Sequence, residues 1–499
     1  MDDKEGAKIP LRLHVLKEKN QVVFAEANSD FVDTLFSYLT LPMGKIVRIL
    51  KTKCDLQAGD IGCFGNLYQS VENLDASHLL SEECKQMLLN PVNVAGVLCR
   101  RLKLNIDDTS PANYRVCHYL HCAKPELSLN SIAAAKCNCG REMREPMKQP
   151  GQILSLFRKS DHSTGGAFVS ETGAFIVTDD LHVIPNLPTT VFELFQKLGI
   201  SDLDAVDEIN LNVGYKEMLT ILHCSLHSNS PLTSTFVSKG SKGSNSGCLL
   251  NYEMGNSSGN GMGKMEEAAE MAMTIKLVIQ KSNNKMLFAH AEENFVNFLF
   301  SLLTIPLGGL ARLSGNISFG SVGNLYNSLS TLDPEKHLKS PQLKNMLQNP
   351  QLAALHISQN QLFSFLETET EYYRQTKRVF LPSGGHIQNF YVVQNQVRGF
   401  LPNESCKKLL LKDPKFKGQY ARPSMFIVTP DMHVASLTKF SVVSHFRRLG
   451  IPLSDVEEQV INIGMAEVQK ILKASFESNL VLTDEDIKIM TKRIKREQT

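Results

Sequence analysis

Two stretches of the chain, 11–50 and 275–314, carry closely similar sequences. The first reads LRLHVLKEKNQVVFAEANSDFVDTLFSYLTLPMGKIVRIL, and the second reads IKLVIQKSNNKMLFAHAEENFVNFLFSLLTIPLGGLARLS. They align over forty residues without a gap and are identical at sixteen positions, including Phe24 with Phe288 and Gly44 with Gly308. This agreement indicates an internal duplication.

Shorter repeats further along keep the same order. GNLYQS at 65–70 recurs as GNLYNS at 323–328, and FIVTDDLHV at 175–183 recurs as FIVTPDMHV at 426–434. A chain of 499 residues is too long for one ordinary domain, so its length agrees with two copies. We expect each copy to close around its own hydrophobic interior.

The repeats define four segments. The first copy is predicted at 10–227, with a Cys-rich insert near 114–143, and the second copy at 273–478. Between them, 228–263 is rich in Ser, Gly and Asn, which is typical of a flexible linker. A charged tail, 479–499, ends the chain.

Hydrophobic periodicity predicts the elements of each copy. Apolar residues alternate on both sides of a Lys-Asn turn at 11–24, which is typical of a β-hairpin with one buried face. Ser29 is placed to cap a following helix, and Pro42 to restart the chain as a second helix. Further segments predict a hairpin and two helices, at 174–177 with 182–184, at 191–198 and at 214–226. The fold class is therefore α+β: two tandem homologous lobes, each with short β-hairpins packed on several helices.

Charge and hydropathy exclude some classes of partner. Fifty-three Lys and Arg against fifty-one Asp and Glu leave +2, which predicts no general attraction for nucleic acid. The polar start MDDKEGAKIP lacks the pattern of a signal peptide, so we expect a soluble cytoplasmic or nuclear protein. The uncharged stretch 294–311 is near the length of a membrane span, but its counterpart contains Asp30, Asp33 and Lys45. We predict a buried helix pair there and no membrane association.

Four cysteines in the first copy have the pattern of a metal site. Cys117 and Cys122 lie close together, and Cys137 and Cys139 follow within a 23-residue window, with Gly140 available for a sharp turn. Four thiolates suit tetrahedral zinc and leave no open coordination position, so the predicted site is structural. The spacing departs from Cys-x2-Cys, which weakens the signal.

Two alternatives to this ligand set stay open. His118 or His121 could replace a cysteine as a ligand. Alternatively, the cysteines could hold no metal and stay as reduced thiols, as is usual in proteins that are not secreted. In the second copy, Thr376 and Leu381 stand where Cys117 and Cys122 stood. Zinc is therefore expected to be an accessory to the repeated unit.

The N-terminal stretch, the GNLY tetrad and the CNCGREM turn together resemble the plant family called domain of unknown function 674. The resemblance covers essentially both copies. It implies a land-plant source, a tandem arrangement of the domain and the paired-cysteine segment. It implies no activity, cofactor or catalytic residue.

Acid/base chemistry has one weak candidate, the pair Asp180 with His182 and its repeat, Asp431 with His433. A carboxylate can orient an imidazole for proton transfer, but hydrogen bonding within a turn explains the spacing more simply. The GNLY tetrads favour helix starts, and no common nucleotide-binding or hydrolase motif is present. We therefore expect a non-catalytic interaction or scaffold protein with a protein partner; the alternative is an acid/base enzyme or small-ligand binder that uses these pairs.

Overall fold

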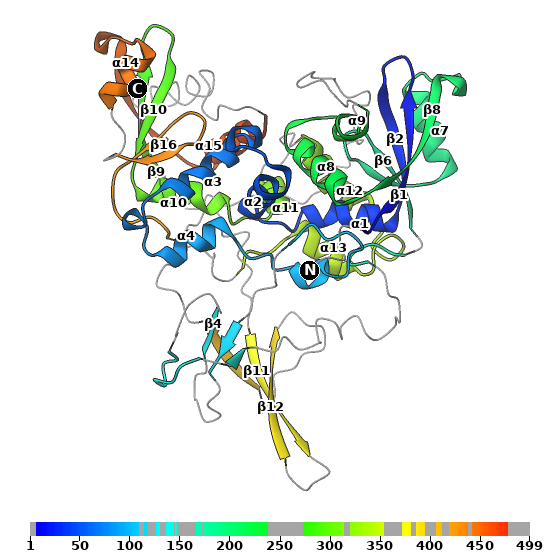
Figure 1. The fold of residues 1–499 in the computed structure, drawn as a ribbon, viewed down its shortest axis with the longest axis horizontal. Helices are drawn as coiled ribbons and strands as arrows, with labels where there is room; N and C mark the ends of the chain where they lie inside the picture. Colours follow the sequence, from blue (N-terminus) through cyan, green and yellow to red (C-terminus); the bar gives the residue numbers. More distant parts are fainter. Residues whose placement is uncertain are drawn as a thin grey trace.

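The computed structural model describes most of the chain. The described residues are 6–108, 114–117, 126–129, 136–143, 145–146, 166–171, 173–237, 273–313, 320–353, 372–380, 386–394, 406–411, 419–437 and 442–477. They form two lobes of mixed helix and sheet around a central group of helices (Figure 1), so the predicted α+β class and two-lobe layout are confirmed.

Each lobe contains a five-stranded antiparallel sheet, and the two sheets have the same strand order. The first has the order β7 (Val183–Pro185), β6 (Ala174–Thr178), β2 (Gln21–Asn28), β1 (Ile9–Leu16), β8 (Val206–Val213). The second has the order β15 (Val434–Ser436), β14 (Phe426–Val428), β10 (Lys285–Ala291), β9 (Met273–Gln280), β16 (Val456–Ile463). Both hairpins predicted in the first copy are confirmed, because β1 pairs with β2 and β6 pairs with β7. Alternate residues of β1, such as Leu11 and Leu13, are buried.

Two helices follow each first hairpin. They are α1 (Ser29–Tyr38) with α2 (Met43–Cys54), and α10 (Glu293–Leu302) with α11 (Leu307–Leu313). Asn28 caps α1, because its side chain accepts the Phe31 N–H at 3.1 Å, so the prediction that Ser29 is the cap is wrong by one residue. The uncharged stretch 294–311 forms α10 and α11, as predicted.

None of the helices in the described ranges combines the length and the apolar character needed to cross a bilayer.

The two copies meet where these helix pairs turn. Pro42 and Pro306 form an antiparallel bridge, and the Gly44 N–H donates to the Leu303 carbonyl at 2.7 Å. The Gly308 N–H donates in the same way to the Leu39 carbonyl at 2.8 Å. The repeated Pro-x-Gly segments therefore hold one copy against the other.

A third pair of helices is exchanged between the copies. In the first copy, α3 (Cys63–Asn73) contacts β15, α10 and α15 (Met465–Glu477), all from the second copy. In the second copy, α12 (Gly320–Thr331) contacts β7, α1 and α8 (Tyr215–His227) of the first. One buried apolar cluster contains residues of both halves, so the prediction that each copy closes around its own interior is wrong.

The remaining helices complete this body. They are α4 (Glu82–Leu89), α5 (Gly96–Cys99), α7 (Pro188–Lys197), α9 (Pro231–Phe236), α13 (Pro341–Gln348) and α14 (Val442–Leu449), with the 3-10 turns Ala58–Ile61, Ala76–His78, Leu203–Ala205 and Leu453–Asp455. Helix α7 packs on the outer face of the first sheet, and α14 packs on the outer face of the second.

Helix α9 lies inside the segment that was predicted to be a linker. Leu232 is buried in the common core, and the Thr233 hydroxyl donates to Asp179 Oδ2 at 2.7 Å. Residues 228–237 are therefore part of the body, which corrects the linker start. The rest of the predicted linker, 238–263, and the predicted tail, 479–499, lie outside the described residues.

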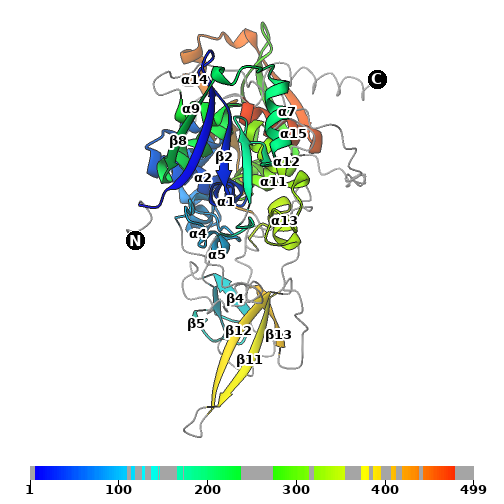
Figure 2. The same cartoon turned by 90° about the vertical axis from the view of Figure 1, so that its right-hand side faces the viewer.

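The inserts of both copies form one further sheet that projects from the body (Figure 2). Its order is β12 (His386–Gln394), β11 (Tyr372–Phe380), β13 (Cys406–Leu411), β4 (Glu126–Leu129), β3 (Tyr114–Val116), β5 (Glu145–Pro146). The copies join through parallel pairing of β13 with β4, where Leu410 lies opposite Glu126. The Cys-rich insert is thus part of a composite sheet.

Candidate metal centre

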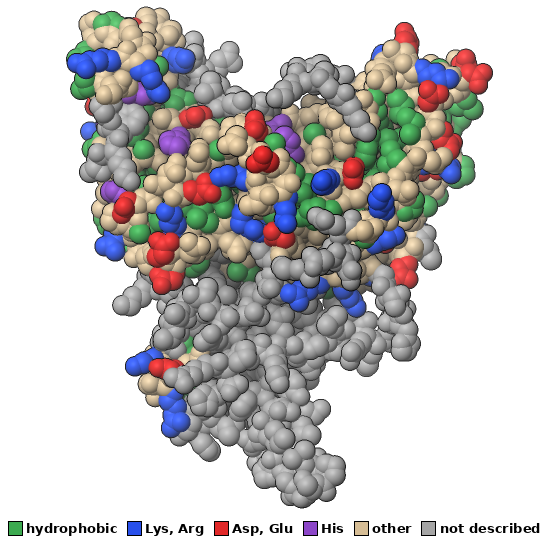
Figure 3. Space-filling view, in the orientation of Figure 1, with side chains coloured by type: hydrophobic (Ala, Val, Ile, Leu, Met, Phe, Trp, Pro, Cys, Tyr) green, Lys and Arg blue, Asp and Glu red, His purple; other side chains and the backbone are tan. Residues whose placement is uncertain are grey.

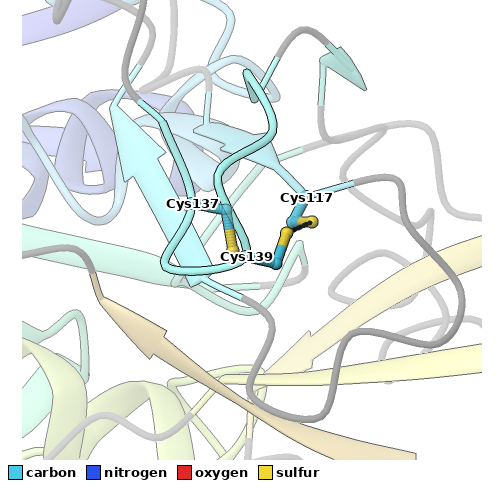
Figure 4. A group of neighbouring side chains, drawn as sticks. All are labelled: Cys117, Cys137 and Cys139. Carbon is cyan, nitrogen blue, oxygen red and sulfur yellow. Dashed lines mark hydrogen bonds between the residues drawn. The ribbon is translucent and has the colours of Figure 1, made fainter.

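Three of the four predicted cysteine ligands lie together. Cys117 directly follows β3, and Cys137 and Cys139 lie in the turn that precedes β5. The three sulfur atoms are within 4.8 Å of one another, and the sulfurs of Cys117 and Cys139 are 3.5 Å apart (Figure 4). Cys122, His118 and His121 lie outside the described residues.

The turn that carries Cys137 and Cys139 is closed by backbone hydrogen bonds. The Cys137 N–H donates to the Arg141 carbonyl at 2.8 Å, and the Gly140 N–H donates to the Cys137 carbonyl at 2.8 Å. Gly140 has a φ of +81°, a left-handed conformation that costs glycine little. The chain can therefore reverse within four residues and bring both sulfurs toward Cys117.

The sulfur positions fit a zinc ion. With zinc–sulfur bonds of about 2.3 Å, a tetrahedral site separates its sulfurs by about 3.8 Å, which lies between the 3.5 Å contact and the 4.8 Å limit. Thiolates are soft ligands, which favour zinc over magnesium or calcium. Cys117 and Cys137 are buried beside Met143, and Cys139 is exposed. This apolar cluster is small, so a metal could contribute much of the local order.

The Asp180 and His182 pair lies in the turn between β6 and β7. The Thr178 hydroxyl donates to Asp180 Oδ1 at 2.5 Å, and His182 Nδ1 lies 3.2 Å from the same oxygen. The His182 N–H donates to the Thr178 hydroxyl at 2.9 Å. Both residues of the pair are nearly buried, so this carboxylate is engaged within its own turn.

The second pair has the same turn. The Thr429 hydroxyl donates to Asp431, and the His433 N–H donates to the Thr429 hydroxyl at 3.1 Å. Leu181 and Met432 occupy equivalent positions in the two turns, with φ of +65° and +63°. Leucine and methionine rarely adopt a positive φ, yet each does so in its turn. The surrounding contacts therefore fix this backbone conformation.

Each Asp also accepts a hydrogen bond from the other copy. Asn324 Nδ2 donates to Asp180 Oδ2 at 3.1 Å, and Asn66 Nδ2 donates to Asp431 Oδ2 at 3.4 Å. Asn66 Nδ2 also donates to the Asp431 carbonyl at 3.0 Å. These asparagines belong to the two GNLY tetrads, near the N-terminal ends of α3 and α12. The sequence placed them at helix starts but did not reveal their contact with the other copy.

The serine of each GNLY repeat completes the same contact. Ser328 Oγ accepts the Val183 N–H at 2.9 Å, and Ser70 Oγ accepts the Val434 N–H at 2.8 Å. Ser70 Oγ also lies 3.3 Å from His433 Nδ1. The joint presence of Asn, Ser and Asp in both copies was the signal in the sequence that could have revealed this contact.

Two further buried carboxyl groups lie away from the thiols. Burial raises the pKa of Asp33 to about 6, although the N–H groups of 167–169 act in the opposite direction. Burial also raises the pKa of Asp179 to about 6, against hydrogen bonds from the backbone and hydroxyl of Thr233. Both carboxyl groups anchor chain segments, because they accept hydrogen bonds from backbone groups of distant residues.

Fold and site together define a two-lobed α+β protein with a thiol cluster on a composite sheet. The chain belongs to the family described as "Protein of unknown function (DUF674)", whose profile matches residues 5–466 and again 424–497. The longer match covers both copies at once, so it does not divide the chain into two family domains. No curated protein and no solved structure matches the chain.

Proposed function

We propose that this chain is a non-catalytic interaction or scaffold protein with a structural zinc ion in the insert of its first copy. The zinc would be held by Cys117, Cys137 and Cys139, with Cys122 as the fourth ligand. The observation that supports the site most directly is the mutual approach of three sulfurs within 4.8 Å. His118 and His121 are the alternative fourth ligands.

Such an ion would join two parts of the insert. Cys117 continues β3, and the turn of Cys137 and Cys139 leads to β5, which pairs with β3. A complete set of four protein ligands leaves no position for water or substrate, so the zinc would stabilise structure and would not act as a Lewis acid. Its binding energy would contribute directly to folding of the insert.

The non-catalytic role is supported by the contacts of the two Asp–His pairs. Asp180 is buried and accepts hydrogen bonds from Thr178 and from Asn324 of the other copy. An acid/base enzyme or a ligand binder would need such a carboxylate to face a substrate. The two pairs instead take part in the contact between the copies. We therefore propose that the protein binds a protein partner.

Metal analysis of the full chain tests the zinc site. The purified protein should contain about one zinc per chain, and Cys137→Ser with Cys139→Ser should remove it, because two of four ligands are lost. Cys54→Ser with Cys224→Ser is the matched control, since it removes two thiols that lie outside the cluster. This control should retain the zinc.

Two results would contradict the assignment. One is unmutated protein, prepared without chelator and with zinc in the medium, that contains no metal. The other is equal zinc loss in both double variants, which would mean that the metal is bound nonspecifically by thiols. Far-ultraviolet circular dichroism of each variant shows whether the body has stayed folded.

A further inference from the structure

The thiol cluster holds one exposed sulfur beside a buried one. Cys139 is exposed, Cys117 is buried, and their sulfurs are 3.5 Å apart. A disulfide requires a sulfur–sulfur distance of about 2.0 Å, so the two side chains must close a gap of about 1.5 Å. Rotation of an exposed side chain in a turn covers a movement of this size. These two sulfurs are therefore placed for oxidation to a disulfide.

The third sulfur of the cluster is a poorer partner for Cys139. Cys137 and Cys139 lie in one turn, which backbone hydrogen bonds of Cys137 with Gly140 and Arg141 close. A disulfide between them would form a small ring and distort this turn, and distorted disulfides store strain. Cys117 instead approaches the turn from the end of β3, 22 residues before Cys139. The geometry therefore favours the pair Cys117 and Cys139.

The thiols of the body are protected by burial. Cys63, Cys84 and Cys99 are buried in the common core, and burial raises the pKa of their thiols to about 12, 11 and 12. Burial also raises the pKa of Cys54 and Cys224, which are partly exposed. A thiol with a raised pKa forms little thiolate, which is the form that reacts with oxidants. These five thiols are therefore poor targets for oxidation.

A neutral oxidant is guided by exposure and not by surface charge. Acidic and basic side chains are interspersed on the face of the body shown in Figure 3, so that face has no field of one sign to steer a charged reagent. Hydrogen peroxide is a small neutral oxidant of thiols. Among the described cysteines, Cys139 is the exposed one, so it is the sulfur that peroxide meets first.

We propose that Cys117 and Cys139 form a reversible redox switch, in which a hydroperoxide joins them as a disulfide and the zinc ion leaves. The thiolate is the form of cysteine that binds a metal, so the disulfide removes two ligands at once. Cys137 keeps its thiol and is released from the metal. The proposal rests on the proposed zinc site and names how that site is regulated.

The oxidation proceeds in two steps that balance. The Cys139 thiolate attacks one peroxide oxygen, the oxygen–oxygen bond breaks, and hydroxide leaves, so that Cys139 becomes a sulfenic acid. The Cys117 thiolate then attacks the Cys139 sulfur, the sulfur–oxygen bond breaks, and a second hydroxide leaves. The two sulfurs together lose two electrons and the peroxide gains them. Both hydroxides take up protons from the buffer.

Reduction by a dithiol reverses the change. A reducing thiolate attacks the exposed Cys139 sulfur and displaces the Cys117 thiolate, and the second thiol of the reductant then displaces Cys139. Both ligands are restored and zinc can bind again. The switch acts on the composite sheet, because Cys117 continues β3 and the turn of Cys139 leads to β5, which pairs with β3.

Zinc release and thiol loss, measured together on the full chain, test the proposal. Zinc-loaded protein is treated with hydrogen peroxide, and the released zinc is measured with a chromophoric chelator. The remaining thiols are alkylated, and disulfide-linked peptides are identified by mass spectrometry. About one zinc per chain should be released while about two thiols are lost, and the linked peptides should contain Cys117 and Cys139. Dithiothreitol should restore zinc binding.

Two single variants separate the roles of the sulfurs. Cys137→Ser and Cys139→Ser each remove one sulfur from the same turn, so they are matched in their effect on the metal site. Zinc in excess keeps the site occupied in both. Cys137→Ser should form the disulfide at a rate within about threefold of the unmutated protein. Cys139→Ser should form a disulfide about tenfold more slowly, because the sulfurs of Cys117 and Cys137 are buried.

Three results would overturn the switch. They are zinc-loaded protein that keeps its zinc in excess peroxide, a disulfide that does not include Cys139, and equal rates of disulfide formation in the two variants. Loss of the buried thiols of Cys63 and Cys99 together with the zinc would also overturn it, because general oxidation would then explain the release. Protein that contains no zinc before peroxide is added would instead contradict the zinc assignment, so the two failures can be told apart.

Discussion

Asp33 and Asn297 occupy the same position in the two copies and have the same task. Asp33 accepts the N–H groups of Phe168 and Val169 at 2.7 and 3.2 Å. Asn297 accepts those of Tyr420 and Ala421 at 2.7 and 2.8 Å. Each anchored segment then bridges to the other copy, at Leu338 and at Leu79. The first copy makes this contact with the ionisable carboxyl group of Asp33, and the second makes it with the amide of Asn297, which does not ionise.

The difference predicts a pH dependence that one substitution should remove. Burial raises the folded-state pKa of Asp33 from 3.8 to about 6, so the folded state binds the proton more tightly than the unfolded state does. Protonation of Asp33 therefore stabilises the folded state by about 3 kcal/mol below about pH 4, and this stabilisation is lost as the pH rises through 6. The stability of Asp33→Asn relative to the unmutated protein should thus increase between pH 4.5 and pH 7, as measured by urea unfolding.

Asn297→Asp is the reciprocal control. It places a carboxyl group in the equivalent, half-buried site, so its stability relative to the unmutated protein should decrease over the same pH interval. A relative stability of Asp33→Asn that does not change with pH would show that the carboxyl group of Asp33 is not protonated in the folded state in this range.

At the scale of elements, the Pro-x-Gly segments between α1 and α2 and between α10 and α11 allow the copies to approach closely. A Cβ atom on Gly44 would lie 2.8 Å from the Leu88 carbonyl oxygen and 3.0 Å from that of Leu303. On Gly308 it would lie 3.0 Å from the Leu39 carbonyl oxygen. Backbone atoms cannot move aside as a flexible side chain can, so both positions require glycine.

Gly44→Ala should therefore destabilise the protein by about 1–3 kcal/mol, because the added methyl group would collide with the backbone of Leu88 in the same copy and of Leu303 in the other. The midpoint of thermal unfolding measures the effect. Gly59→Ala is the matched control, since a Cβ atom there would have no neighbour within 4 Å, and it should change stability by less than about 0.5 kcal/mol. Equal midpoints for the two variants would contradict the close backbone packing around Gly44.

The sequence predicted elements whose apolar residues recur at a regular spacing. The alternation at 11–24 and the helical spacing at 31–39 identified β1, β2 and α1, of which β1 alternates between buried and exposed residues, whereas β2 and α1 are buried almost throughout. Strand β8 is an edge strand exposed over much of both faces, so its residues show no such period. The candidate site follows the same rule. Cysteine spacing predicted a cluster, and three of the sulfurs lie together. The role of Asn66 depends on a contact with a residue far away in the sequence, which spacing does not reveal.

At the scale of the whole molecule, the exchange of α3 and α12 was beyond prediction from one sequence. The two sheets have the same strand order, so a helix face that fits one sheet should fit the other nearly as well. Periodicity reports which residues are buried but not which copy buries them. The exchange makes the two halves mutually dependent, because each sheet packs against a helix that the other half supplies.

This dependence predicts the behaviour of a nicked chain. A protease site inserted between 238 and 263 should allow complete cleavage, yet the two fragments should elute together in size-exclusion chromatography at the volume of the intact protein. They should separate only in denaturant, since separation exposes the apolar surface that α3 and α12 bury in the opposite lobe. Fragments that part in native buffer would mean that each half buries its own helix, and the exchanged contacts of Asn66 and Asn324 would then not exist in solution.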